Sequence, residues 1–472
     1  MTAVPRAALE HAHASASHAS AYPASASPAS RPPASGDPTW SAQHYDLELH
    51  CDVAVNRLEG VARIVGRAAG DLDALELDLV GLAATAVTID GAPAAWTQHP
   101  ERLELRPAAP IPAGASFAIE VAYGGSPAPR ATPWGEVGWR HRGEGAIAAA
   151  DAGAAPTWYP CNDRLSDRAT LRIRITAEQR CRAIATGALV EETTDAGRTA
   201  RTFVTRAPTA PARTSLHLGR YLRGAATRAA VPLVAYVPSA LGPRALGDLA
   251  VVPRMLACFV ERFGRYPFDD YTIVVAPDAL ERPRESLAGA VLRADRVDGS
   301  PAAERPLAHL LAHQWFGAGV GGADLQHRWL DDGLARYAEW LWSEAAGDAS
   351  TDALAHEHHE LLADSPQDFA LTDPPPELLV DDRIGHRGAL LVHALRVALG
   401  DLPFFALLQA WAAQHAHGPV TTDDFRRLAG AHARAGTSLD ALLDAWLLDP
   451  ALPPLPSRAR RGRGERARLR GR

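Results

Sequence analysis

The 472-residue chain has no lysine, few cysteines and no long apolar run, and these absences narrow its class. All 48 of its basic residues are arginines, which suggests a high-GC genome more than a function. The formal net charge of -7 provides no overall basic surface for nucleic acid. No segment reaches the roughly 18 apolar residues that a membrane span needs, so we expect no membrane association.

The four cysteines are scattered along the chain and form no CxxC pair. This spacing argues against a zinc ribbon and against a thioredoxin-like redox motif. We expect reduced, partly buried thiols, although the sequence leaves a disulfide between two of them open. The cysteines are Cys51, Cys161, Cys181 and Cys258.

Both ends of the chain have the composition of disordered tails. Residues 1–37 are rich in Ala, Ser, Pro and His and lack the apolar run of a signal peptide, so we expect a cytoplasmic protein. Residues 457–472 are rich in arginine. A solvated tail is the simpler interpretation of this segment, and contact with an acidic surface or nucleic acid is the alternative.

Between these tails the pattern changes from strands to helices near residue 224. Over residues 38–223 apolar and polar residues alternate with period two, as in HYDLELHCDV and ASFAIEVAYGG, which predicts an all-β domain. Over residues 224–456 helical spacing dominates around one short buried strand, DDYTIVVAP. In this part TTDD at 421–424 has the residues of a helix start. The order of elements predicts an α+β fold.

Two histidines, His309 and His313, lie four residues apart on the predicted helix RPLAHLLAHQWFG. This spacing puts both imidazoles on one helix face, where they can share a zinc ion. The pair alone is weak evidence, because a chain with 19 histidines contains such pairs by chance. The alternative is a helix with two histidines packed against its neighbours.

The segments around this pair occur in an order that resembles the M1 family of zinc aminopeptidases, which are gluzincins related to aminopeptidase N. The resemblance covers about residues 40–456 and implies a β saddle domain, then a thermolysin-like α/β zinc-peptidase domain with a helical C-terminal part. It also implies zinc as the cofactor, held by His309, His313 and Asp332, which lies 19 residues after His313. The segments that carry the resemblance are PTWYPCNDRLSDRATLRI, FGRYPFDDYTIVVAP, LLAHQWFG, WLDDGLARYAEWLW and DDRIGHRGALLVHALR.

The chain departs from the family's pattern at two positions that serve its chemistry. The family's HExxH motif has a glutamate that moves a proton from the metal-bound water to the leaving amine, and this chain has Leu310 there. The family's oxyanion-stabilising tyrosine corresponds to Gly385. A positioned acid–base group contributes about 10²–10⁴ in rate, and an oxyanion donor contributes about 10²–10³. The resemblance therefore predicts little peptidase activity.

Four further residues are candidates for ligand binding or catalysis. The resemblance places Asp151 and Glu285, with Glu281 as second choice, at the acidic positions that bind the substrate's amine. His386 adjoins the lost tyrosine position and is a candidate catalytic donor; a surface or capping histidine is the alternative. Asp331 is a candidate catalytic base; an aspartate that braces the helix start is the alternative.

These residues leave three hypotheses for function. The first is an M1-family protein without peptidase activity that binds a small amino-acid-like or peptide ligand, or a protein partner. The second is an enzyme repurposed for a small amino-acid-like intermediate in secondary metabolism. The third, ranked last, is an active aminopeptidase with a substitute base such as Asp331 or His327. Whether zinc is bound stays open, and the run HEHHE at 356–360 is interpreted as a solvated helix face.

Overall fold

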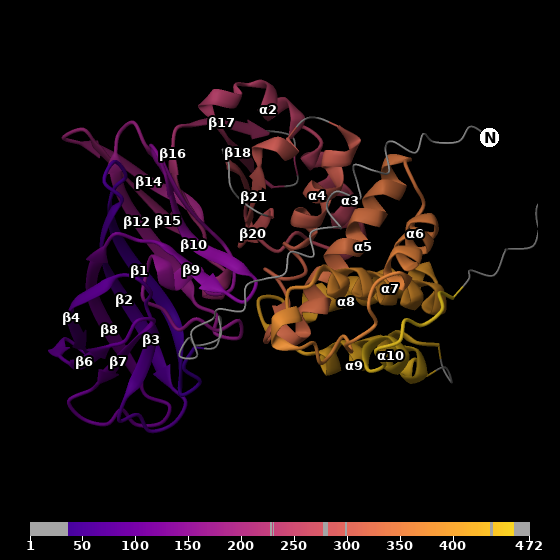
Figure 1. Ribbon diagram of the computed structural model, residues 1–472, viewed down its shortest axis with the longest axis horizontal. Coiled ribbons are helices and arrows are strands. Elements are labelled where there is room, and N and C mark those ends of the chain that lie inside the picture. Colours follow the sequence, from indigo (N-terminus) through magenta and orange to yellow (C-terminus); the bar gives the residue numbers. More distant parts are fainter. Residues whose placement is uncertain are drawn as a thin grey trace, which may run out of the picture.

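A computed structural model describes residues 36–226, 229, 231–276, 282–297, 300–434 and 438–456. Nearly all of the two expected tails, and the alternative ligand residue Glu281, lie outside these ranges. Figure 1 shows an N-terminal β region beside a C-terminal region that is mainly helical. The predicted α+β fold, an all-β domain followed by a mixed α/β domain, is confirmed. Among the described helices, none combines the length and the apolar character needed to cross a membrane.

The largest element of the N-terminal domain is an eight-stranded sheet in the order β14-β15-β12-β1-β2-β8-β4-β5. Strand β1 pairs in parallel with β12 and antiparallel with β2. Alternate side chains of β1, such as Tyr45, Leu47 and Leu49, are buried, as the period-two pattern predicted. The strands are β1 (Trp40–Asp52), β2 (Arg57–Ala68), β4 (Ala83–Ile89), β5 (Ala92–Pro93), β8 (Ser116–Gly125), β12 (Thr170–Glu178), β14 (Ala188–Asp195) and β15 (Arg198–Val204).

A five-stranded sheet in the order β13-β16-β11-β10-β9 joins this domain to the next one. Its apolar side chains form small clusters with the C-terminal sheet, for example Ile184 with Tyr236 and Val274. A three-stranded sheet in the order β3-β7-β6 completes the domain. The strands of these two sheets are β3 (Leu75–Asp78), β6 (Ala95–Gln98), β7 (Arg102–Arg106), β9 (Pro129–Thr132), β10 (Gly135–Arg142), β11 (Gly145–Ala149), β13 (Arg182–Ala185) and β16 (Leu216–Gly219).

The C-terminal domain begins with a five-stranded sheet in the order β17-β18-β19-β21-β20. Strands β18, β19 and β21 run parallel, while β20 is an antiparallel edge strand. The strands are β17 (Tyr221–Ala226), β18 (Leu233–Pro238), β19 (Tyr271–Ala276), β20 (Arg284–Ser286) and β21 (Gly289–Arg293), with a separate pair, β22 (Gly321–Gly322) and β23 (Pro419–Val420).

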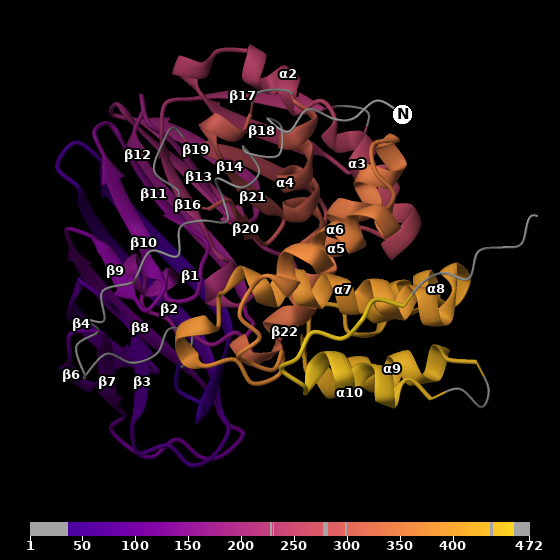
Figure 2. The ribbon, with the colours of Figure 1, turned by 45° about the vertical axis from the view of Figure 1, so that its right-hand side comes forward.

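Helices follow this sheet and lie on the side away from the N-terminal domain (Figures 1 and 2). The helix start predicted at TTDD is confirmed, because the Thr421 side chain caps α9 and forms a capping box with Asp424. The helices are α2 (Arg244–Asp248), α3 (Val252–Phe263), α4 (Pro301–Ala312), α5 (Arg328–Ala346), α6 (Thr351–Ala363), α7 (Asp382–Leu399), α8 (Asp401–Gln414), α9 (Thr422–His432) and α10 (Asp440–Leu447).

The four cysteines carry free thiols, three of them buried, in agreement with the expectation of reduced and partly buried side chains. Cys51, Cys161 and Cys181 are in the N-terminal domain, whereas Cys258 is on α3 and is half-buried. The disulfide that the sequence left open is therefore absent from these four described residues.

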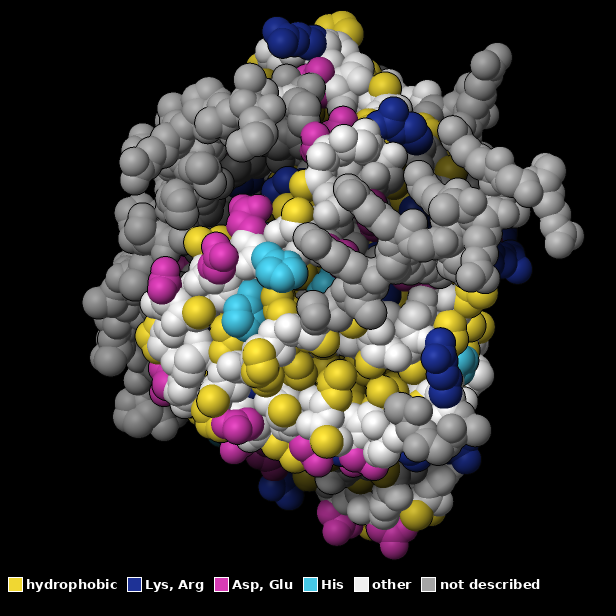
Figure 3. All heavy atoms as spheres, turned by 90° about the vertical axis from the view of Figure 1, so that its right-hand side faces the viewer, with side chains coloured by type: hydrophobic (Ala, Val, Ile, Leu, Met, Phe, Trp, Pro, Cys, Tyr) yellow, Lys and Arg dark blue, Asp and Glu magenta, His cyan; other side chains and the backbone are white. Residues whose placement is uncertain are grey.

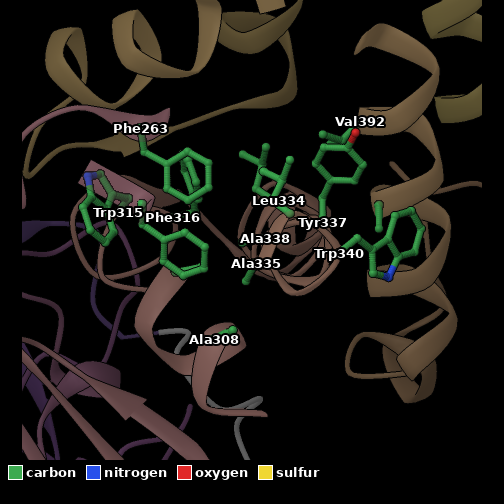
Figure 4. Packing of buried hydrophobic residues seen from close by; sticks show 14 of the residues in the cluster. Phe263, Ala308, Trp315, Phe316, Leu334, Ala335, Tyr337, Ala338, Trp340 and Val392 are labelled. Carbon is green, nitrogen blue, oxygen red and sulfur yellow. The ribbon is translucent and has the colours of Figure 1, made fainter. Parts of the chain in front are cut away.

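Helix α5 is the centre of the C-terminal core. Its side chains Leu334, Tyr337 and Trp340 are buried, and Figure 4 shows them between α7 and the aromatic residues that follow α4. Trp315 and Phe316 extend that aromatic cluster to Phe263 of α3, with ring centroids 5.8 and 4.9 Å from the Phe263 ring. The core thus fixes α5 relative to α4 and α7, the helices that carry most of the candidate site residues.

Two glycines allow α5 and α7 to cross in close contact. A Cβ atom added to Gly388 would lie 2.9 Å from the Cα of Gly333 and 3.1 Å from the carbonyl oxygen of Trp329. Both distances are shorter than ordinary contacts with backbone atoms, which cannot swing aside as a flexible side chain can. The closest approach of α5 to α7 therefore requires glycine at this position.

We predict that Gly388→Ala destabilises the protein by about 1–3 kcal/mol, because the two helix backbones must separate to admit the methyl group. Urea denaturation of the purified variant measures the change. Gly430→Ala is the matched control, since this glycine lies inside α9 with no atom within 4 Å of the added Cβ. That variant should keep or raise stability, by up to about 1 kcal/mol. Equal losses in the two variants would contradict the close-contact explanation.

Candidate active site

The candidate site is assembled from both domains. Helix α4 carries His309 and ends next to His313, and the N-terminal part of α5 carries Asp331 and Asp332. Edge strand β20 carries Glu285. Gln314 joins β20 to the end of α4, because its amide nitrogen donates to the carbonyl oxygens of Ser286 and Gly289 at 3.2 and 3.0 Å. The N-terminal domain contributes Asp151, after β11, and a short 3₁₀ turn, Pro211–Arg213.

The two histidines of α4 point at each other, as their spacing predicted. Their Nε2 atoms are 3.0 Å apart. The Nδ1 of His313 donates to the carbonyl oxygen of Phe316 at 2.8 Å, which leaves its Nε2 without a proton in the neutral ring. Burial lowers the pKa of His313 well below its usual range, and the neighbouring His309 lowers it further. Two such nitrogens facing one point are what a divalent metal requires of a histidine pair.

A carboxylate of α5 lies behind His309. The Nδ1 atom of His309 is 2.8 Å from Oε1 of Glu339, although the two groups are not aligned as a hydrogen bond. Burial alone would raise the pKa of Glu339, but Arg336 and His309 outweigh burial and lower it. A carboxylate behind a ligating imidazole is a usual arrangement in metal sites, where it holds the ring in position.

The third expected ligand, Asp332, is bound to an arginine instead. Its Oδ2 accepts a hydrogen bond from Nε of Arg328, one turn earlier on α5, at 2.5 Å. Its Oδ1 lies 3.7 Å from Nε2 of His313. Burial opposes ionisation of Asp332, but Arg328 and the histidine pair outweigh it and hold the pKa of this carboxyl well below its usual range.

The residues present therefore do not fit zinc in the way that the resemblance implied. The two imidazoles converge, but the carboxylate that would complete the set already neutralises a guanidinium. Within the described ranges no three His, Cys, Asp or Glu side chains are grouped closely enough to hold a metal ion. A metal would have to share Asp332 with Arg328, and two cations beside one carboxylate repel each other.

Apolar atoms occupy the positions that resemble the general base and the oxyanion tyrosine. Leu310 is 2% exposed and belongs to the core of the C-terminal domain. A Cβ atom on Gly385 would lie 3.4 Å from Cβ of Asp332, so this position of α7 faces the site. A side chain at this position would extend towards Asp332, but glycine has no side chain.

The two acidic residues expected to bind an amine each hold an arginine. Asp151 pairs with Arg284 at 2.7 Å, and Glu285 pairs with Arg213. The other end of Arg213 pairs with Asp331, whose Oδ2 lies 3.1 Å from Nη2 of the arginine. All of these side chains are less than a quarter exposed. The chain thus supplies its own cations to the carboxylates at this end of the site.

The candidate catalytic residues Asp331, His327 and His386 have other partners. Asp331 accepts from the backbone N–H of Gly322 at 3.1 Å as well as from Arg213, which suits an aspartate that braces the start of α5. Burial raises its pKa, and Arg213 opposes that shift. The Nδ1 of His327 lies 3.1 Å from the hydroxyl of Thr422. His386 stacks on the ring of His358, with centroids 4.8 Å apart.

Sequence reasoning missed five residues of this site. Two of them had a local signal, because Arg328 lies four residues before Asp332 and Glu339 lies seven after it, on the same helix face. The other three approach their partners only through the fold, since sequence gives no sign of these pairings. They are Arg213, Arg284 and His358.

Comparison with known proteins shows which proteins this chain resembles. The model described as the peptidase family M1 domain matches residues 249–446. Solved structures agree over a longer span: an M1 zinc metallopeptidase from Deinococcus radiodurans, in a substituted form bound to a Tyr-Ser-Ala substrate, superposes with a TM-score of 0.83 at 27% identity. That match covers 90% of this chain and 98% of the other. This chain is a homologue of the M1 peptidase family.

Relatives of this M1 homologue with established names are aminopeptidases. Aminopeptidase N of Streptomyces lividans is 26% identical over 215 residues, which are 40% of this chain and 24% of the relative. Aminopeptidase O of Rattus norvegicus is 23% identical over 274 residues, which are 48% of this chain and 32% of the relative. The chain therefore matches a third or less of the length of these relatives.

We predict that Arg213→Met destabilises this M1 homologue by about 3 kcal/mol, because it leaves Glu285 and Asp331 buried without their shared cation. Thermal and urea denaturation measure the loss. Arg206→Met is the matched control, since Arg206 and its partner Asp269 have side chains 85% and 58% exposed. An exposed pair contributes at most about 1 kcal/mol. Similar small losses in both variants would show that the Arg213 pairs are not important for folding.

Proposed function

We propose that this M1 homologue binds a small amino-acid-like or peptide ligand without hydrolysing it. The single observation that carries the proposal is the pairing of the site's carboxylates with arginines of the same chain. The amine of a peptide and a metal ion are both cations that the family's carboxylates would receive. In this chain Arg213, Arg284 and Arg328 already fill those places.

The residues at the proton-transfer and oxyanion positions support the same proposal. Leu310 cannot accept a proton from water, and Gly385 has no side chain with which to donate a hydrogen bond. Together these groups contribute about 10⁴–10⁷ in rate if their effects multiply, and less where they act as a unit. A loss of that size would leave little peptidase activity.

An active aminopeptidase with a substitute base has less support. Asp331 is held by Arg213 and by the Gly322 backbone, so using it as a base would break both contacts. His327 is held at Thr422, the first residue of α9. The hypothesis of a repurposed biosynthetic enzyme stays a prediction, and the neighbourhood of the gene is its simplest test.

The first test is hydrolysis of the tripeptide Tyr-Ser-Ala and of aminoacyl naphthylamides by the purified protein, with and without added zinc. We expect no turnover above the blank, because Leu310 and Gly385 supply neither a base nor an oxyanion donor. Leu310→Glu/Gly385→Tyr is the matched variant that returns both groups. Turnover in the wild type that is lost in His309→Ala would overturn the proposal, whereas turnover in the double variant alone would support it.

The second test concerns the metal. We predict that protein purified without chelators contains far less than one zinc per chain, because Arg328 competes for Asp332. Arg328→Met should raise zinc content towards one per chain and make the melting temperature rise with added zinc. Arg328→Lys keeps a cation beside Asp332 and should behave like the wild type. Stoichiometric zinc in the wild type, measured by elemental analysis, would contradict the prediction.

A further inference from the structure

Two arginines lie near the histidine pair along helices α4 and α5. Arg305 lies one turn before His309 on α4, and Arg336 lies three residues before Glu339 on α5. Since Nδ1 of His309 is 2.8 Å from Glu339, these arginines flank the point where α4 meets α5. They are distinct from the three arginines that neutralise the site's other carboxylates.

A stack of three rings lies beside these arginines and joins α5, α6 and α7. The rings of Trp340 and His358 are stacked with centroids 5.0 Å apart, and His358 stacks on His386 at 4.8 Å. The Nδ1 atoms of the two histidines are 3.0 Å apart, so one ring donates a hydrogen bond to the other. Because a neutral imidazole has one N–H, the accepting ring carries its hydrogen on Nε2 and can offer it to a ligand.

Burial keeps both imidazoles neutral near pH 7. It lowers the pKa of His358 to about 4, with Arg336 and Arg305 adding to the effect while Glu339 opposes it. Burial also lowers the pKa of His386 well below its usual range, again with help from Arg336. Arg336 thus contributes to the pKa shift of both rings, and Arg305 contributes to that of His358.

Donors exceed acceptors in this group. Arg305 has no hydrogen bond or ion pair with the described part of the chain. Arg336 has a buried Nε without a hydrogen-bond partner among the same residues, and its Nη1 is 3.3 Å from Glu339. Glu339 in turn also faces His309, so this single carboxylate does not satisfy two guanidinium groups. A buried N–H that lacks an acceptor is costly, and an oxygen-rich ligand would remove that cost.

We propose that Arg305, Arg336, His358 and His386 bind the carboxylate or phosphate group of a small anionic ligand. Guanidinium forks and imidazole N–H groups are the donors that proteins use for such oxyanions. All four side chains are only partly buried, so solvent reaches the group. Figure 3 shows histidine side chains at the surface on the helical side of the molecule, without distinguishing which ones they are. The site deepens the proposed binding function, on which it rests, by naming the charge of the ligand.

Isothermal titration calorimetry of the full chain at pH 7.5 tests the site with two probes. Inorganic phosphate represents the phosphate source, and N-acetylalanine represents a carboxylate without a free amine. We expect one of them to bind with a dissociation constant below about 1 mM. The probe that binds more tightly shows whether the site prefers a phosphate or a carboxylate group. Failure of both probes to reach that affinity overturns the proposal.

Variants locate the binding in the four-residue group. Arg305→Ala and Arg336→Ala should each weaken the tighter probe by about 10- to 100-fold, the range for a hydrogen bond to a charged group. Arg305 has no described partner, so its removal should leave the melting temperature unchanged and the result interpretable. Arg244→Ala is the matched control, because this exposed arginine at the start of α2 carries the same charge far from the group in sequence.

An equal loss of affinity in Arg244→Ala and Arg305→Ala would overturn the site, because binding would then depend on overall charge alone. This outcome is distinguishable from failure of the proposed function, which the hydrolysis assay decides separately. Absence of both hydrolysis and anion binding removes the site and leaves the non-hydrolytic function. Metal-dependent hydrolysis with anion binding intact removes that function and leaves the site.

Discussion

Neutralisation of buried carboxylates is the constraint on which the site depends. A carboxylate taken out of water needs a cation close by, or it becomes protonated. Here the partners are arginines, and the pairs Asp151–Arg284 and Glu285–Arg213 each join a residue of the N-terminal domain to one of the C-terminal domain. The ion pairs that neutralise these carboxylates therefore also connect the two domains at the site.

Helix α5 transmits this arrangement to the core. Its first two turns carry Asp331 and Asp332, and its later turns bury Tyr337 and Trp340 in the centre of the C-terminal domain. The contact at Gly333 fixes its distance from α7. Arg328 and Asp332 lie one turn apart on this helix, so the packed core fixes the backbone from which both side chains extend.

The parts of this structure that follow local rules were predictable from the sequence. Period-two alternation predicted strands such as β1, and four-residue spacing predicted that His309 and His313 would face one another. Even the cation on Asp332 had a local signal, since Arg328 is four residues earlier on the same helix. Spacing along one helix or strand determines the face on which each side chain lies, and this was sufficient to predict these contacts.

Contacts between distant segments were not predictable in this way. Arg213 meets Glu285 and Asp331 across 72 and 118 residues of sequence, and nothing local in any of the three segments marks that meeting. His358 shows a similar limit. It lies in the run 356–360, interpreted as a solvated face, and three members of that run are exposed, but His358 turns inward and stacks on Trp340. Helix periodicity gives the face of a residue, whereas only the neighbouring helix decides whether that face is covered.

The arginines divide the site into two parts that differ in charge. The inner half contains Arg213, Arg284 and Arg328, and the outer half contains Arg305 and Arg336. On the inner half, three guanidinium groups pair with four carboxylates, so every carboxylate there already has a cationic partner and an added cation would compete with an arginine. On the outer half, Arg305 and Arg336 have N–H groups without an acceptor in the described part of the chain. Glu339 is the one carboxylate beside them, and it contacts Arg336. Both halves therefore favour the same kind of ligand, because the first discourages a cation and the second lacks an anion. This charge pattern supports the proposal of an acidic ligand.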